Sequence, residues 1–176
     1  MTKTTETLTA ARPEPTSEIT EADQQFMRRA IALSHDKMQA GCGGPFGAVI
    51  ARNGNLIAEG YNQVTHAQDP TAHAEITAIR QACTALGTHD LSGCVIYTSC
   101  EPCPMCLSAI YWARLDRIYY ANTREDAANI GFDDAFLYDE IARPLAERQL
   151  PMIRLLGREA IRPFQAWQNK VDKQPY

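Results

Sequence analysis

The sequence contains no apolar run long enough to cross a membrane, and its N-terminus lacks the apolar stretch of a secretory signal. We therefore expect a cytoplasmic protein without a membrane partner. The chain also has no excess of positive charge, because it contains 17 Lys and Arg but 21 Asp and Glu, which gives a net charge of −4. Binding along a phosphate backbone needs a basic face, so this balance argues against a nucleic-acid partner.

The glycine-rich segment at residues 41–45 lacks the Gly-Lys-Ser/Thr of a phosphate-binding loop, so we interpret its glycines as turn residues. Large apolar side chains are scarce in residues 1–18, which are rich in Thr, Glu and Pro. Such a segment cannot bury enough surface to offset its ordering entropy, and we predict a flexible tail that activity does not need. Residues 19–176 then form one catalytic domain, long enough for a hydrophobic core.

Hydrophobic spacing predicts alternating helices and strands after the tail. We expect a helix from Thr20 to about residue 40, and then a hairpin of residues 46–52 and 55–60 around Asn53-Gly54. Helices over 73–86 and 103–112 alternate with strands over 94–98 and 117–121. Short helices between 124 and 146, a strand over 152–156 and a last helix with Phe164, Trp167 and Val171 facing inward complete the expectation. This alternation predicts an α/β sandwich in which crossover helices place neighbouring strands parallel.

Two short motifs carry the chemistry of the chain, His73-Ala74-Glu75 and Pro102-Cys103-Pro104-Met105-Cys106. In a cytosolic chain of this length, clustered cysteines indicate a metal site more often than disulfides. His73, Cys103 and Cys106 offer three ligands for a tetrahedral Zn²⁺ and leave the fourth position for water. This combination, His-x-Glu followed by Pro-Cys-x-x-Cys, is the signature of zinc-dependent nucleobase deaminases.

Both motifs fall at predicted helix N-termini, where free backbone N–H groups and the helix dipole favour thiolates. A bound zinc lowers the pKa of its water from about 15.7 toward 7. Glu75 is expected to take the proton from that water and pass it to the leaving nitrogen. The residues thus predict hydrolytic deamination with one Zn²⁺ per subunit.

A closed structural zinc site is the alternative, with Cys100 as a fourth ligand through its own CxxC spacing to Cys103. Such a site cannot activate water and leaves Glu75 without a role. A reading without metal treats the cysteines as core and the first motif as helix surface. The remaining cysteines, Cys42, Cys83 and Cys94, are interpreted as small buried hydrophobes, and His35, His66 and His89 as solvated residues.

The two motifs resemble the cytidine deaminase superfamily, whose members act on several different bases. Further stretches resemble the bacterial guanine deaminases of this superfamily, and together the resemblance runs from about residue 22 to the last residue. These stretches are Pro45–Val49, Gly60–Asn62, Thr123–Ala127, Gly131–Phe136, Pro163–Trp167 and Pro175-Tyr176. The resemblance implies a three-layer α/β/α fold with a five-stranded mixed sheet, an antiparallel first hairpin and a swapped C-terminal helical segment.

The same resemblance implies hydrolysis of guanine to xanthine and ammonia in purine catabolism or salvage. It assigns the purine to Asn62, to the backbone N–H of Ala74 and to the walls Phe46 and Phe132. It also places Asp134 at the guanine edge, where it assists proton transfer. From the residues alone, Asn62 is interpreted as a turn residue, Asp133-Asp134 as the cap of the following helix, and Phe132 and Phe136 as ordinary core.

Members of this family are domain-swapped homodimers whose final Tyr completes the partner's site, which here is the position of Tyr176. A chain end would otherwise be interpreted as frayed. Rival activities are deamination of guanosine, cytosine or ammeline, and deamination of tRNA adenosine. The acidic balance and the C-terminal resemblance argue against the tRNA substrate.

Overall fold

The computed structural model describes residues 18–174 and contains one mixed sheet of four strands in the order β2-β1-β3-β4. Strands β1 (Gly47–Arg52) and β2 (Asn55–Tyr61) form the predicted antiparallel hairpin. Strand β1 also pairs antiparallel with β3 (Cys94–Cys100), which pairs parallel with β4 (Arg117–Asn122). The tail predicted for residues 1–18 lies outside the described residues except for Glu18.

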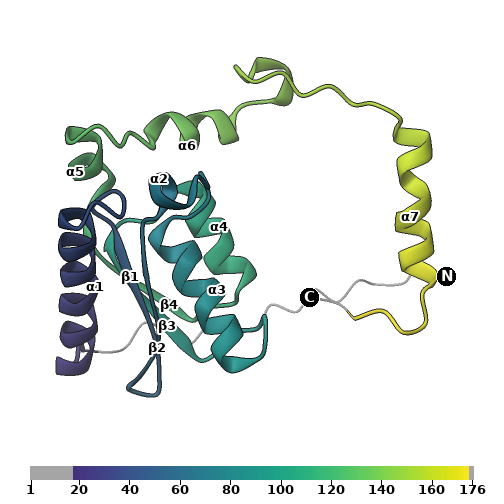
Figure 1. Cartoon of the computed structure of the whole chain (residues 1–176). Coiled ribbons are helices and arrows are strands. Elements are labelled where there is room, and N and C mark those ends of the chain that lie inside the picture. The colour runs from purple at the N-terminus through teal and green to yellow at the C-terminus, as the bar shows by residue number, and fades with distance from the viewer. Residues whose placement is uncertain (1–17, 175–176) are drawn as a thin grey trace.

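Helices cover the two faces of the sheet and give three layers (Figure 1). Helix α1 (Glu21–Gln39) packs on one face, and α3 (Ala74–Leu86) and α4 (Pro104–Trp112) lie on the other. Strand β1 contributes to both cores, because Ala48 and Ile50 face α3 while Val49 and Ala51 face α1. The predicted α/β/α layering is therefore confirmed.

Local sequence signals set the start of α1 and the position of α3 against the sheet. Thr20 and Asp23 form a reciprocal capping box at the start of α1. Helix α3 lies very close to β2, because a Cβ at Gly60 would come within 2.1 Å of the Ala74 carbonyl oxygen. Only a glycine allows this approach, so Gly60 fixes the first turn of α3 directly against the sheet.

The chain after β4 contains short helices that continue along the upper edge of the domain (Figure 1). They are α5 (Arg124–Asn129), α6 (Ala135–Ala142) and the 3₁₀ turn Leu145–Glu147. A further short helix, α2 (Val64–Ala67), lies in the loop between β2 and α3. Among residues 18–174, no helix is long and apolar enough to span a membrane.

Two expectations for the C-terminal part are wrong for the described chain. Residues 152–156 form no strand, so the sheet has four strands rather than five. Helix α7 (Gly157–Asn169) stands apart from the domain in Figure 1, and Phe164 is 73% exposed and Val171 101% exposed rather than facing inward. A strand needs a neighbour for its backbone groups and an apolar helix face needs a packing partner. The described chain folds neither segment against its own core.

Candidate active site

Two helix N-termini bring the candidate zinc ligands together. His73 is the N-cap of α3 and Cys103 is the N-cap of α4, both with extended backbone angles. Pro104 occupies the first turn of α4, where its missing N–H costs no hydrogen bond. Cys106 follows three residues after Cys103, so both sulfurs lie on the same side of that turn.

The distances among these three side chains fit a tetrahedral metal site. The Nδ1 atom of His73 lies 3.6 Å from Cys103 Sγ and 3.5 Å from Cys106 Sγ. With Zn–S about 2.3 Å and Zn–N about 2.0 Å, a tetrahedral angle separates sulfur from nitrogen by about 3.5 Å. The three residues are also the only group of His, Cys, Asp or Glu within residues 18–174 that could hold an ion. The donor set therefore fits zinc.

The electrostatics of the two thiols favour a bound cation. The contact with Cys106, together with the one with His73, lowers the pKa of the Cys103 thiol to about 4. The contact with Cys103 and burial raise the pKa of the Cys106 thiol, because two neighbouring thiolates repel each other. A metal ion held by His73, Cys103 and Cys106 would stabilise both sulfurs as thiolates.

Glu75 lies on the first turn of α3 and is only 6% exposed. Burial raises the pKa of its carboxyl above the usual value of 4.5. The hydroxyl of Thr98 on β3 lies 3.3 Å from Glu75 Oε1 and 3.0 Å from the Cys100 carbonyl oxygen. The single Thr98 hydroxyl hydrogen thus has two acceptors within reach, the Glu75 carboxylate and the Cys100 carbonyl oxygen. Thr98 was not among the predicted site residues, since no spacing rule connects it to Glu75.

A cavity of about 430 Å³ opens beside the candidate ligands. It is lined by predicted site residues from distant parts of the sequence, namely Phe46, Asn62, His73, Glu75, Cys103, Phe132 and Asp134. The rings of Phe46 and Phe132 meet edge to face, with centroids 4.9 Å apart. Ala74 is buried at the start of α3, and Tyr176 lies outside the described residues.

The loop at residues 41–45 does more than turn the chain. It lines the cavity, and the N–H of Gly44 donates to Asn62 Oδ1 at 3.2 Å. The N–H of Val64 donates to the same oxygen at 3.3 Å. Since backbone N–H groups only donate, Asn62 keeps its carbonyl oxygen on this side and can offer its Nδ2 donor to a ligand. A Cβ at Gly43 would lie 2.2 Å from the Asn62 backbone oxygen, so the loop can approach Asn62 only with glycine there.

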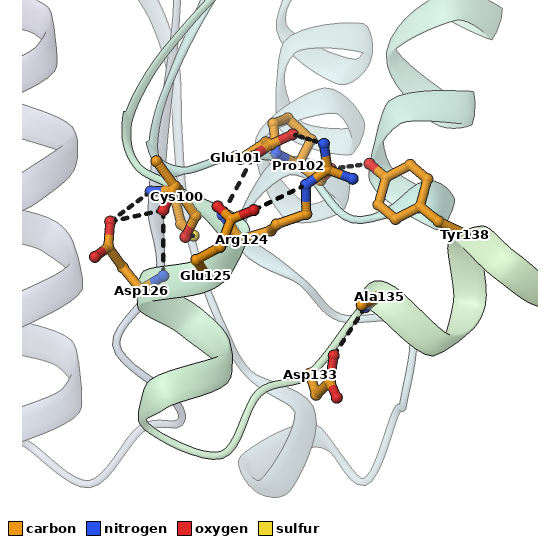
Figure 2. A network of polar contacts seen from close by, with 10 residues as sticks. Cys100, Glu101, Pro102, Arg124, Glu125, Asp126, Asp133, Ala135 and Tyr138 are labelled. Atoms are coloured by element: carbon orange, nitrogen blue, oxygen red, sulfur yellow. Dashed lines mark hydrogen bonds and ion pairs between the residues drawn. The ribbon is translucent and has the colours of Figure 1, made fainter.

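Asp134 is the N-cap residue of α6, but its side chain makes no capping hydrogen bond. The neighbouring carboxylate caps instead, since Asp133 Oδ1 accepts from the N–H of Ala135 at 2.9 Å (Figure 2). Burial raises the pKa of Asp134 above its usual value of 3.8, and the nearby Cys103 acts in the same direction. The capping role read from the residues alone therefore belongs to Asp133, and Asp134 is directed toward the cavity.

Cys100 does not join the candidate metal group. Its Sγ lies 3.5 Å from the carbonyl oxygen of Thr123, and burial raises the pKa of its thiol to about 11. The closed four-ligand alternative is therefore not what the structure shows. The three histidines predicted to be solvated, His35, His66 and His89, are all exposed. Among the other cysteines, Cys94 is buried, whereas Cys42 and Cys83 are half-buried.

Residues 20–122 match the family described as the cytidine and deoxycytidylate deaminase zinc-binding region. The chain is 54% identical to guanine deaminase of Bacillus subtilis over 153 residues, covering 87% of this chain and 98% of that protein. The crystal structure of guanine deaminase from Bacillus subtilis superposes with a TM-score of 0.85 over the same shares of both chains. A tRNA-specific adenosine deaminase of Aquifex aeolicus is 42% identical over 77 residues, which cover 44% of this chain and 51% of that protein.

Proposed function

The chain belongs to the cytidine and deoxycytidylate deaminase family with its zinc-binding region, and on that premise we propose that it hydrolyses guanine to xanthine and ammonia. The supporting observation is the extent of its likeness to the Bacillus subtilis guanine deaminase. The 153 aligned residues must reach beyond residue 122, where the family match ends. The part of the chain that supplies Phe132 and Asp134 therefore shares in that likeness.

The reaction at guanine C2 forms a C–O bond to water and breaks the bond to the exocyclic nitrogen. When held by His73, Cys103 and Cys106, zinc supplies a water of lowered pKa and thus a hydroxide nucleophile near neutral pH. The Glu75 carboxylate accepts the proton that this water loses and delivers it to the exocyclic nitrogen, which leaves as ammonia. Burial raises the pKa of this carboxyl, which favours its protonated form in the step that returns the proton to the leaving nitrogen.

The cavity walls supply the contacts for the purine. Phe46 and Phe132 form an apolar wall for the ring, and Asn62 offers its Nδ2 donor to an acceptor on the base. The N–H of Ala74 belongs to the first turn of α3, where helical N–H groups have no partner within the helix. Asp134 faces the guanine edge and assists proton transfer, since burial favours a carboxyl that can exchange a proton.

A panel of amino-heterocycles tests the substrate. Guanine, guanosine, cytosine and ammeline are incubated with the zinc-loaded protein, and released ammonia is measured. We expect guanine to have the highest kcat/KM. A higher kcat/KM for another compound of the panel would identify that compound, rather than guanine, as the substrate. Salt-sensitive binding of tRNA together with deamination of its adenosine would instead support the tRNA activity.

We also propose a homodimer in which the C-terminal segment crosses to the partner and Tyr176 completes its pocket. The support is the apolar surface that one chain leaves uncovered after residue 149. Its members are Leu150, Met152, Ile153, Leu155, Leu156, Ile161, Phe164, Trp167 and Val171, all at least 44% exposed. Proteins rarely leave so many large apolar side chains of one segment exposed without a partner, and Figure 1 shows α7 lying away from its own domain.

Light scattering coupled to gel filtration tests this assembly. We expect a dimer for the full chain, and lower activity with unchanged melting temperature after deletion of Tyr176. A monomer with normal kinetics, or a fully active deletion variant, would contradict the swap. Removal of residues 1–18 is the matched control and is expected to leave activity intact.

A further inference from the structure

A polar cluster joins the segment after β4 to the loop that carries Cys103 (Figure 2). The hydroxyl of Tyr138 on α6 donates to the carbonyl oxygen of Pro102 at 3.0 Å. The Arg124 guanidinium lies 4.9 Å from the centre of the Tyr138 ring, within the range of a cation–π interaction. Arg124 Nη2 also lies 3.4 Å from Glu101 Oε1, and the Arg124 N–H donates to Glu101 Oε2 at 3.2 Å.

The position of the accepting carbonyl connects this cluster to the metal site. The carbonyl of Pro102 shares one rigid peptide plane with the nitrogen of Cys103. Both residues are buried, and the φ angle of the following Pro104 is fixed by its ring. A hydrogen bond to this plane therefore restricts the direction in which the Cys103 side chain leaves the backbone.

The donor sits on the element that also forms the substrate wall. Tyr138 is one turn after Asp134, the N-cap of α6, and Phe132 precedes that cap. Asp134 and Phe132 both line the cavity that His73 and Cys103 also line. One hydrogen bond thus connects a helix from the substrate side of the cavity with the metal side.

We propose that Tyr138 is a positioning residue that aligns Cys103 with the purine wall, and that Arg124 acts by holding the Tyr138 ring. This inference rests on the proposed function for the identity of the metal and the reaction. Groups that orient a metal ligand typically affect metal affinity by 10- to 100-fold. Because Tyr138 holds the ligand's backbone rather than its sulfur, the effect is expected at the lower end of this range.

Tyr138→Phe tests the role of the hydroxyl while keeping the ring and its stacking on Arg124. Zinc affinity is measured by competition with a chelating dye, and the thiolate-to-metal absorption is measured after loading with Co²⁺. We expect zinc binding to weaken about 10-fold and the Co²⁺ band to shift, with an unchanged far-UV spectrum. Tyr120→Phe, a tyrosine 52% exposed on β4, is the matched control and should match the wild type. Equal zinc affinity and Co²⁺ spectra in the two variants would overturn the proposal.

Arg124→Met provides a second comparison that does not depend on the folding of Tyr138→Phe. It removes the guanidinium but retains the backbone N–H that donates to Glu101. We expect zinc binding to weaken about 3-fold, and the double variant to bind zinc as weakly as Tyr138→Phe alone. Fully additive effects, or none from Arg124→Met, would refute a role through the ring. These measurements need no substrate, so failure of the wild type to deaminate guanine would refute the proposed function separately.

Discussion

Glu75→Gln separates binding of the metal from movement of the proton. The glutamine keeps the size of the side chain and leaves the distances among His73, Cys103 and Cys106 unaltered, because Glu75 is not one of the three candidate ligands. It removes only the carboxylate that can accept and return a proton. We therefore expect full zinc occupancy together with a severe loss of turnover.

The expected loss follows from the buried position of this carboxyl. Glu75 is 6% exposed, so bulk water cannot readily replace it as the proton acceptor. Loss of a general acid–base group costs roughly 10²- to 10⁴-fold in rate. This corresponds to about 2.7–5.4 kcal/mol on the activation barrier.

The assay combines released ammonia with zinc measured by atomic emission on the same sample. Glu125→Gln, at an exposed carboxylate with 75% of its side chain accessible, is the matched control and should retain activity. Turnover by Glu75→Gln within about 10-fold of the wild type would refute the reasoning. Loss of zinc from Glu75→Gln would also contradict the assignment, because it would show that Glu75 helps to hold the metal.

Glu75→Gln should also change how the stability of the zinc-free protein depends on pH. Burial raises the folded-state pKa of Glu75 above 4.5, so folding takes up a proton between pH 4.5 and that raised pKa. The wild type therefore loses stability as pH rises through this window, whereas the permanently neutral glutamine does not. We expect Glu75→Gln to melt at a higher temperature than the wild type at pH 8 and to converge with it below about pH 4. A constant difference across this range would contradict the sign of the shift.

Three further predictions concern the purine and the reaction. Asn62→Asp keeps the oxygen that accepts from Gly44 but replaces the Nδ2 donor by an acceptor, and should raise the KM for guanine by about 10-fold or more without changing zinc content. Gly43→Ala brings a methyl group within 2.2 Å of the Asn62 backbone oxygen, so we expect a stability loss of about 1–3 kcal/mol in chemical denaturation and a raised KM. In the wild type, kcat/KM should fall as pH decreases through the raised pKa of Glu75, because the protonated carboxyl cannot accept a proton; a flat acid limb would contradict this assignment.

Short-range signals in the sequence predicted the features that depend on neighbouring residues. Asn53-Gly54 predicted the hairpin, and the ligand motifs predicted two helix starts that meet. Both depend on backbone preferences over a few residues. The sequence could therefore predict the candidate metal centre and most of the sheet.

Features that depend on long-range packing could not be predicted in this way. The orientation of the Asn62 amide is set by Gly44, which is 18 residues away, and the contact of Thr98 with Glu75 spans 23 residues. The apolar face of α7 predicted inward packing, which the described chain does not show. The period of such a face identifies the apolar side chains but cannot show what covers them. The strand expected at residues 152–156 failed similarly, because an apolar run does not show whether a neighbouring strand is present to pair with it.

The close approach of Gly60 on β2 to the Ala74 carbonyl on α3 means that β2 helps to position the metal centre. A methyl group there would meet the Ala74 carbonyl at 2.1 Å, and relief of that overlap would push the first turn of α3 outward by about 1 Å. Metal sites tolerate about 0.2 Å in their ligand distances. Gly60→Ala adds a single carbon atom on an edge strand, outside the cavity. It would therefore displace His73 and Glu75 relative to the two cysteines. The geometry of the metal centre thus depends on the short distance between β2 and α3 as well as on the three ligands.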